Sequence, residues 1–179
     1  MLLRSARPAD AAEVAGVHVR SWQSAYRGLL PDEFLDGLRP EDRAARYTFG
    51  GPGAGAPATI VAVDSGAIRG FATAGPCREA DARGTGELYA VYVDPCAWGH
   101  GVGRQLMAGA RDYLARLGFG QAVLWVLAGN QRAERFYRLD GWAPDGCSRI
   151  EEIGPGWQSD GMPQWDRKVS EIRYHRTLP

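Results

Sequence analysis

The clearest pattern in the chain is a short aromatic and β-branched run, a glycine-rich turn, and then a helical periodicity. The run Glu87–Val93 predicts a strand, and Pro95 ends it because proline cannot donate to a sheet ladder. After the turn Gly99–Gly103, apolar residues recur at three- and four-residue steps, which predicts an amphipathic helix: Val102, Leu106, Ala110, Tyr113, Leu114 and Leu117. The first N–H groups of such a helix have no helical partner, so we expect a phosphorylated ligand at this turn.

The residues before this centre predict a strand, three helices and a hairpin. The first strand is Leu2–Arg7, and the helix Ala11–Tyr26 follows a proline. Two short helices begin at Pro31 and Pro40, where proline precedes acidic residues. Their apolar faces are narrow, so we expect them to cover a site rather than to form the central core. A flexible, glycine-rich connection follows over 50–57. It leads to two predicted strands, Ala58–Asp64 and Ala67–Ala74, which are joined by a turn at Ser65-Gly66.

The residues after the centre complete a single sheet. Gln121–Leu127 is a continuous apolar run, which is typical of a strand buried on both faces. Asn130 is predicted to cap a helix over Gln131–Leu139. The chain after Trp142 is predicted to be loop-rich until a closing strand at Glu171–Leu178. The alternation of strands and helices favours one α/β domain over residues 1–179, with helices packed on one sheet.

Composition narrows the range of partners. Lys plus Arg and Asp plus Glu both total 21, so no basic excess points to nucleic acid or to an anionic membrane. The chain has neither an apolar run of membrane-spanning length nor a signal-peptide pattern at its amino terminus, and we expect a cytoplasmic protein. The three cysteines lack metal-ligand spacing and a disulfide framework, and His18 and His175 have no second ligand type nearby. We expect no metal site.

Three blocks of sequence resemble the GNAT N-acetyltransferase superfamily. Trp98–Arg104 (WGHGVGR) is similar to the family's (Gln/Arg)-x-x-Gly-x-(Gly/Ala) pyrophosphate signature. Asn130–Trp142 is similar to its Asn-x-x-Ala-x-x-Phe-Tyr-x-x-x-Gly-Phe block, and Leu3–Asp10 to its opening strand and helix start. The resemblance spans roughly Leu2 to Trp142. Trp98 departs from the signature, which usually has Gln or Arg at this position.

The resemblance implies a mixed sheet flanked by helices and splayed between Glu87–Val93 and Gln121–Leu127, with acetyl-CoA in the opening. Pantetheine amides would pair with the backbone of Val91 and Val93, and the pyrophosphate would lie on the N–H groups of the glycine turn. Asn130 would contact a cofactor amide as well as cap its helix, and His100 is either exposed or a phosphate contact. The expected cofactor-binding residues are Val91, Tyr92, Val93, Trp98, Gly99, His100, Gly101, Val102, Gly103, Arg104, Asn130, Ala133, Phe136 and Tyr137.

Acyl transfer to an amine makes three chemical demands. A lysine-like amine has a pKa of about 10.4 and must lose a proton; Glu87 is the candidate base, directly or through water, and its alternative is an exposed acid at a strand end. An N–H near Tyr92–Val93 would stabilise the oxyanion. Tyr137 matches the family's general acid, and its alternative is a packed tyrosine. Phe136, about 100° away on the same helix, is expected to enter the core. Cys96 makes a covalent route conceivable, but the resemblance implies direct transfer.

The acceptor is expected to be a small molecule or an exposed peptide amine. Five aromatic residues are the candidate acceptor pocket, suited to a planar or cationic amine: Trp22, Tyr26, Phe34, Tyr89 and Tyr92. The stripe of His18, Trp22 and Tyr26 fits core packing as well as a pocket wall. Residues 145–168 either fold over this pocket or trail along the surface, and the closing strand offers an edge for a homodimer.

Two further functions are compatible with these patterns. One is a non-catalytic acyl-CoA-binding or regulatory domain on the same fold. The other is a phosphate-binding α/β domain of another kind, against which the lack of a Gly-Lys-Ser/Thr ending on the turn argues.

Overall fold

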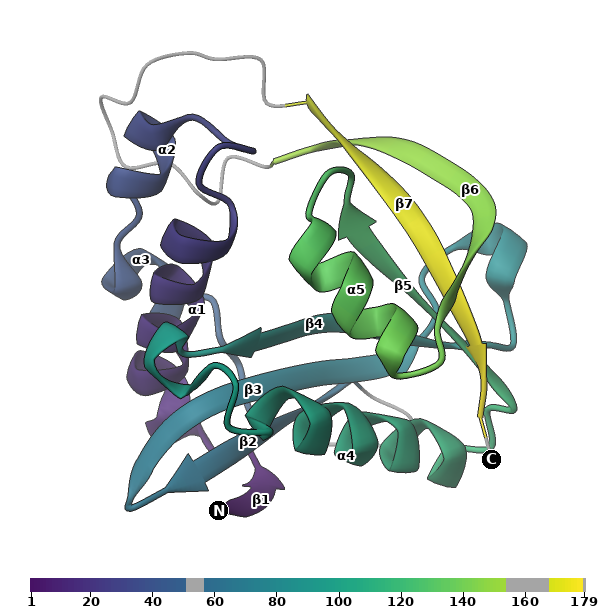
Figure 1. Cartoon of the computed structure of the whole chain (residues 1–179). Helices are drawn as coiled ribbons and strands as arrows, with labels where there is room; N and C mark the ends of the chain where they lie inside the picture. Colours follow the sequence, from purple (N-terminus) through teal and green to yellow (C-terminus); the bar gives the residue numbers. More distant parts are fainter. Residues whose placement is uncertain (51–56, 154–167, 179) are drawn as a thin grey trace.

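The protein is built on one seven-stranded sheet in the order β1-β2-β3-β4-β5-β7-β6 (Figure 1). The computed structural model describes residues 1–50, 57–153 and 168–178. Only β4 and β5 run parallel, and every other neighbouring pair is antiparallel. The strands are β1 (Leu2–Ser5), β2 (Ala58–Asp64), β3 (Ala67–Pro76), β4 (Gly86–Val93), β5 (Gln121–Leu127), β6 (Ala143–Glu152) and β7 (Lys168–Thr177). The predicted α/β mixed sheet is therefore confirmed.

Helices cover both faces of this sheet. They are α1 (Ala11–Ala25), α2 (Asp32–Asp36), α3 (Pro40–Ala44), α4 (Val102–Arg116) and α5 (Gln131–Leu139). Successive strand residues point to opposite faces, and the core divides accordingly. Val61 and Phe71 pack with Val14 and Val17 of α1. Their strand neighbours Ala62 and Ala72 pack instead with α4 and α5, through residues including Leu106 and Tyr137.

The sheet opens between its two parallel strands. β4 and β5 are paired only at Gly86–Leu88, after which they diverge (Figure 1). On the other side of β4, Thr73 pairs with Ala90 but Ala74 pairs with Leu88, so Tyr89 is an extra residue in the ladder. Such a bulge bends a strand and increases its twist. The bend begins at the residue where β4 leaves β5, and it explains the splay that the family resemblance implied.

Several predicted elements are confirmed to the residue. Gln121–Leu127 and Gln131–Leu139 have the predicted bounds. The Ser65-Gly66 turn joins β2 to β3 with positive φ at both residues, 50° and 82°. This is the geometry that two-residue hairpin turns favour. β2 also has the predicted bounds, whereas β1 ends two residues earlier than expected and β3 two residues later, as is usual for element ends.

Two predictions at the carboxyl-terminal side are wrong. The chain after Trp142 was predicted to be loop-rich, but it forms β6. The closing strand was predicted to offer a free edge for a homodimer, but β7 is paired on both sides, to β5 and to β6. A strand with both edges occupied cannot extend a sheet into a second copy. The part of the expected flap at 154–167, and residues 51–56 of the glycine-rich connection, lie outside the described residues.

Candidate active site

A cavity of about 700 Å³ occupies the opening between β4 and β5. Its lining comes from α1, β4, the turn before α4, β5, α5, β6 and β7. One end is formed by the glycine turn and the amino-terminal halves of α4 and α5. The other end is formed by aromatic and charged side chains of α1, β4, β5, β6 and β7.

The glycine turn is shaped by two residues that a side chain would disfavour. Gly99 and Gly101 have φ values of 81° and 80°, in the left-handed region that glycine adopts readily. Gly101 is the N-cap of α4, and the first helical bond is donated by Gln105 to its carbonyl. The N–H groups of Val102, Gly103 and Arg104 therefore have no partner within the helix. All four of these cap and first-turn residues line the cavity, which makes this end an anion-binding site.

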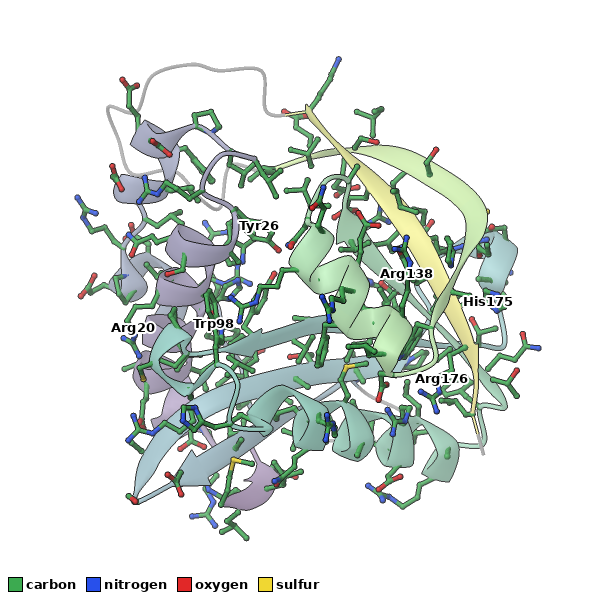
Figure 2. All side chains as sticks on the ribbon, viewed as in Figure 1. Arg20, Tyr26, Trp98, Arg138, His175 and Arg176 are labelled. Atoms are coloured by element: carbon green, nitrogen blue, oxygen red, sulfur yellow. The ribbon has the colours of Figure 1, made fainter. Side chains whose placement is uncertain are left out.

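Trp98 connects this turn to α1 and α5. Its Nε1 donates to the carbonyl of Val93 at 2.8 Å, and the Ser21 hydroxyl donates to the same oxygen at 2.8 Å. Figure 2 shows Trp98 beside α1, and the guanidinium of Arg20, also on α1, bonds Asp94. The Arg132 guanidinium lies 3.2 Å from the centre of the Trp98 ring. Arg132 of α5 therefore supplies a positive charge beside Trp98, which stands where the sequence signature usually has Gln or Arg. The sequence analysis did not predict this role, although Arg132 is only two residues after Asn130.

The backbone of β4 offers hydrogen-bonding groups to the splay. The backbone N–H of Asp94 donates to the carbonyl oxygen of Arg69 in β3 at 2.8 Å. Peptide groups of an antiparallel strand alternate in direction, so Val91 and Val93 direct theirs away from β3, toward the opening. The carbonyl of Val93 already accepts two bonds, which leaves its N–H for a ligand. Both residues line the cavity.

Tyr137 and Asn130 are brought to this cavity by α5. Asn130 caps the helix as predicted, accepting from the Ala133 N–H at 3.1 Å. Tyr137 is 8% exposed, and among the described residues no group is within hydrogen-bond distance of its hydroxyl. Burial, and secondarily the neighbouring Tyr92, raises the pKa of Tyr137 well above its ordinary value. The phenol therefore stays protonated at neutral pH. Phe136, expected in the core, is half-buried and also lines the cavity.

Replacing Asn130 with alanine should destabilise the protein. The side chain accepts a helix N–H and is buried. Loss of such a cap typically costs about 1 kcal/mol. Urea unfolding of Asn130→Ala against the wild type measures this difference, with Asn130→Asp as the control that keeps an acceptor. Equal unfolding midpoints would contradict the capping role.

Glu87 lies at the other end of the cavity, but not as an exposed acid. Its side chain is 1% exposed, and Arg78 holds both carboxylate oxygens. Oε2 accepts from the Arg78 backbone N–H at 3.0 Å and from Nε at 3.2 Å, and Oε1 accepts from Nη2 at 2.5 Å. Arg78 also covers the ring of Tyr89, whose hydroxyl donates to the carbonyl of Pro76. The alternative of an exposed strand-end acid is contradicted.

The predicted aromatic residues divide between the cavity and its support. Trp22, Tyr26, Tyr89 and Tyr92 line it, and Tyr26 lies at the carboxyl end of α1 on the side facing α5 (Figure 2). The hydroxyls of Tyr26 and Tyr92 are 3.5 Å apart. Two expected site residues do not line the cavity: Phe34 is buried against Trp22, and His100 is exposed on the turn. His18 packs on Tyr92 with its Nδ1 bonded to Tyr47, as the core-packing alternative expected.

Charged residues of β6 and β7 complete the acceptor-side wall and were not predicted from the sequence. Arg149, Glu151, Glu152 and Glu171 line the cavity beside Trp125. Arg149 bonds Glu171 at 2.8 Å and stacks over Trp125 at 4.2 Å. β6 carries no apolar alternation, and the sequence does not indicate which strands β7 pairs with, so only the fold reveals that these residues reach the site.

Two kinds of feature, a metal-binding cluster and a membrane-spanning helix, were sought among the described residues. Over residues 1–50, 57–153 and 168–178, no group of three or more His, Cys, Asp or Glu side chains is placed to hold a metal ion. In the same ranges, no helix has the length and apolar character needed to cross a membrane.

A splayed mixed sheet with a glycine turn at a helix N-terminus defines an acyltransferase-like architecture, and the comparisons agree. The model of the acetyltransferase (GNAT) family matches residues 19–142. The chain is 31% identical over 165 residues to the uncharacterized N-acetyltransferase YuaI of Bacillus subtilis, covering 87% of this chain and 91% of that protein. The protein therefore belongs to the GNAT acetyltransferase family.

Solved structures share this fold at low sequence identity. PaiA N-acetyltransferase of Thermoplasma acidophilum, solved with coenzyme A, superimposes with a TM-score of 0.69 at 16% identity, covering 99% of this chain and 98% of that one. The putative acetyltransferase yncA of Salmonella typhimurium, solved with acetyl-CoA, gives 0.69 at 21% identity, covering 100% and 94%. At these identities the likeness concerns the fold.

Proposed function

We propose that the protein transfers the acetyl group of acetyl-CoA directly to a primary amine of a small molecule or an exposed peptide amine. The observation that carries this proposal is one continuous cavity, which joins the anion-binding turn to an aromatic and acidic end through the opening of the sheet. Donor and acceptor can thus meet in one ternary complex. Family membership and the coenzyme-bound relatives support acetyl-CoA as the donor.

The donor end fits acetyl-CoA. The unpaired N–H groups of Val102–Arg104 face the position of the pyrophosphate, where the dipole of α4 also favours negative charge. Arg132, held over Trp98, supplies a nearby cation. The peptide groups of Val91 that point into the splay can pair with a pantetheine amide as an added strand would, which leaves the N–H of Val93 for the reacting end. This path brings the thioester to the middle of the cavity, beside Tyr137.

Residues in the middle of the cavity meet the demands of acyl transfer. The N–H of Val93 is available to the developing oxyanion. Tyr137, kept protonated by burial, is placed to donate to the departing sulfur. Glu87 forms part of the acceptor wall, but its two oxygens are held by Arg78. That ion pair makes Glu87 a weaker candidate for direct proton removal than the sequence implied.

A non-catalytic acyl-CoA-binding domain would be favoured if the α1–α2 segment closed the acceptor side. Instead, Trp22, Tyr26 and Leu30 of that segment line the open cavity. The enzyme is therefore the better supported function.

Two measurements test the proposed function together. Acetyl-CoA should raise the unfolding temperature by mass action. Release of CoA thiol should then depend on the amine added from a broad panel of monoamines, diamines, amino acids and peptides. No shift with acetyl-CoA would contradict the cofactor site. A shift without amine-dependent thiol release would favour the binding domain instead.

A further inference from the structure

We propose that Glu171 is the carboxylate that binds the ammonium group of the acceptor and takes up its proton. This inference rests on the proposed function and assigns a step of it to a residue of β7. It also defines the acceptor as a cation without a carboxylate of its own.

Glu87 and Glu171 of the cavity differ in which carboxylate oxygens remain without a partner. Both oxygens of Glu87 are occupied by Arg78, and the side chain is 1% exposed. Glu171 is 20% exposed, and Arg149 contacts only its Oε2, through Nε and Nη2 at 2.8 Å. Among the described residues, Oε1 of Glu171 has no partner. A carboxylate oxygen can accept a strong, charge-assisted bond from an ammonium group.

The position of Glu171 places it opposite the aromatic wall. On β7 it pairs with Leu127 of β5 on one side and with Arg149 of β6 on the other. Its charge raises the pKa of both Tyr26 and Tyr92, although burial is the main cause for each. The carboxylate therefore lies within electrostatic reach of α1 and β4 across the cavity. Tyr26, Tyr92 and Trp22 present ring faces and edges around the same space, which suits a cation.

The charges at this end select the acceptor. Four carboxylates line it, those of Glu87, Glu151, Glu152 and Glu171, against the two guanidiniums of Arg78 and Arg149. Each guanidinium is already bonded to carboxylates: Arg78 to Glu87, and Arg149 to Glu79 and Glu171. No free guanidinium among these described residues can receive an acceptor carboxylate. The site therefore favours monoamines and diamines over amino acids.

The proton balance of the step is complete with these groups. The acceptor ammonium gives one proton to Glu171, which later passes it to solvent. The neutral nitrogen attacks the thioester carbon, so a C–N bond forms and the C–S bond breaks. The second proton of that nitrogen replaces the one that Tyr137 gives to the sulfur. The products are an acetamide, CoA thiol and one released proton.

The surroundings of Glu171 give the step a pH dependence. Burial raises the pKa of Glu171 above its ordinary value, opposed by Arg149 on β6, while Glu151 on β6 adds to the rise and Arg78 opposes it. Tyr26 and Tyr92 face it across the cavity as neutral phenols. Ammonium binding requires the ionised carboxylate, so it should weaken as the pH falls through this raised pKa.

A pair of CoA thioethers tests the inference without a known acceptor. The first probe, S-(ω-aminoalkyl)-CoA, carries an ammonium group on a chain of two to four methylene groups attached to the sulfur. The second, an S-alkyl-CoA of the same chain length, is its isostere, with a methyl group in place of the ammonium group. By calorimetry, the wild type should bind the best amine about tenfold more tightly than its isostere, as expected for one charge-assisted bond. Glu171→Gln should lose that preference at every pH and still bind the isostere normally.

Glu33→Gln, at an exposed position outside the cavity lining, is the matched control that should keep the full preference, and Glu87→Gln and Glu152→Gln should each reduce it less than Glu171→Gln does. Loss of the preference in Glu87→Gln but not in Glu171→Gln overturns the inference in favour of Glu87. Absence of any preference in the wild type also overturns it. Failure of the isostere itself to bind wild type contradicts the proposed CoA site, and this result is distinct from the others. Normal isostere binding by Glu171→Gln also shows that the variant is folded.

Discussion

Tyr137→Phe should lower the turnover number for amine acetylation by roughly a hundredfold or more, the scale of a lost proton donor, while the affinity for acetyl-CoA changes little. The hydroxyl has no protein partner among the described residues, and the side chain is buried against the cavity. Removing it should therefore leave packing intact and remove only the donor to the sulfur.

The raised pKa of Tyr137 shapes this expectation. A thiol has a pKa of about 8.5, well below that of the buried phenol, so complete transfer of the proton to a free thiolate is unfavourable. The tyrosine should therefore pass its proton to the sulfur only in concert with its replacement by a proton from the attacking nitrogen, so that no tyrosinate accumulates. The rate loss should then be nearly constant from pH 6 to pH 9, because the phenol does not titrate in that range.

Tyr174→Phe is the matched control for this change. Tyr174 is also buried and lies 6.3 Å from Tyr137 by ring centroids. Its hydroxyl donates to Glu134 at 3.0 Å, and the residue does not line the cavity. Its loss should lower stability with little effect on turnover. A Tyr137→Phe enzyme as fast as Tyr174→Phe would show that Tyr137 is only a packed side chain.

The donor half of the site could be predicted because its signals are local. The glycine turn, the helix start at Val102 and the N-cap Asn130 are each set by residues close together in the chain. Positive φ at Gly99 and Gly101, and the capping bond of Asn130, follow from short-range backbone requirements. The family blocks fall on these same residues, so pattern and resemblance agree.

The acceptor half depends on contacts between distant residues. β6 has no apolar alternation, and ion pairs such as Arg149–Glu79 and Arg149–Glu171 stabilise it instead. These pairs span 70 and 22 residues, a separation at which sequence spacing gives no indication of contact. Glu171 was therefore assigned to a closing strand with no role. For the same reason the sequence did not predict the ion pair between Arg78 and Glu87, because that contact depends on the turn between β3 and β4.

Gly103→Val should weaken acetyl-CoA binding by about a hundredfold, because a side chain here enters the anion site. A Cβ at Gly103 would lie 3.2 Å from Phe136 and 3.6 Å from Val93, between α4, α5 and β4. The two valine methyl groups would narrow the path by which the pyrophosphate reaches the first-turn N–H groups. Losing one or two charge-assisted hydrogen bonds accounts for an effect of about this size.

Gly109→Val separates this effect from a general cost of valine in α4. A Cβ at Gly109 would lie 3.2 Å from Leu3 and 3.6 Å from Ile60, and the residue does not line the cavity. The two variants add the same side chain to the same helix at similar crowding, so their unfolding temperatures without ligand should fall by similar amounts. Calorimetric titration with acetyl-CoA should then distinguish them. If Gly103→Val binds as tightly as Gly109→Val, the pyrophosphate does not lie on the first turn of α4, and the donor end must be placed elsewhere in the cavity.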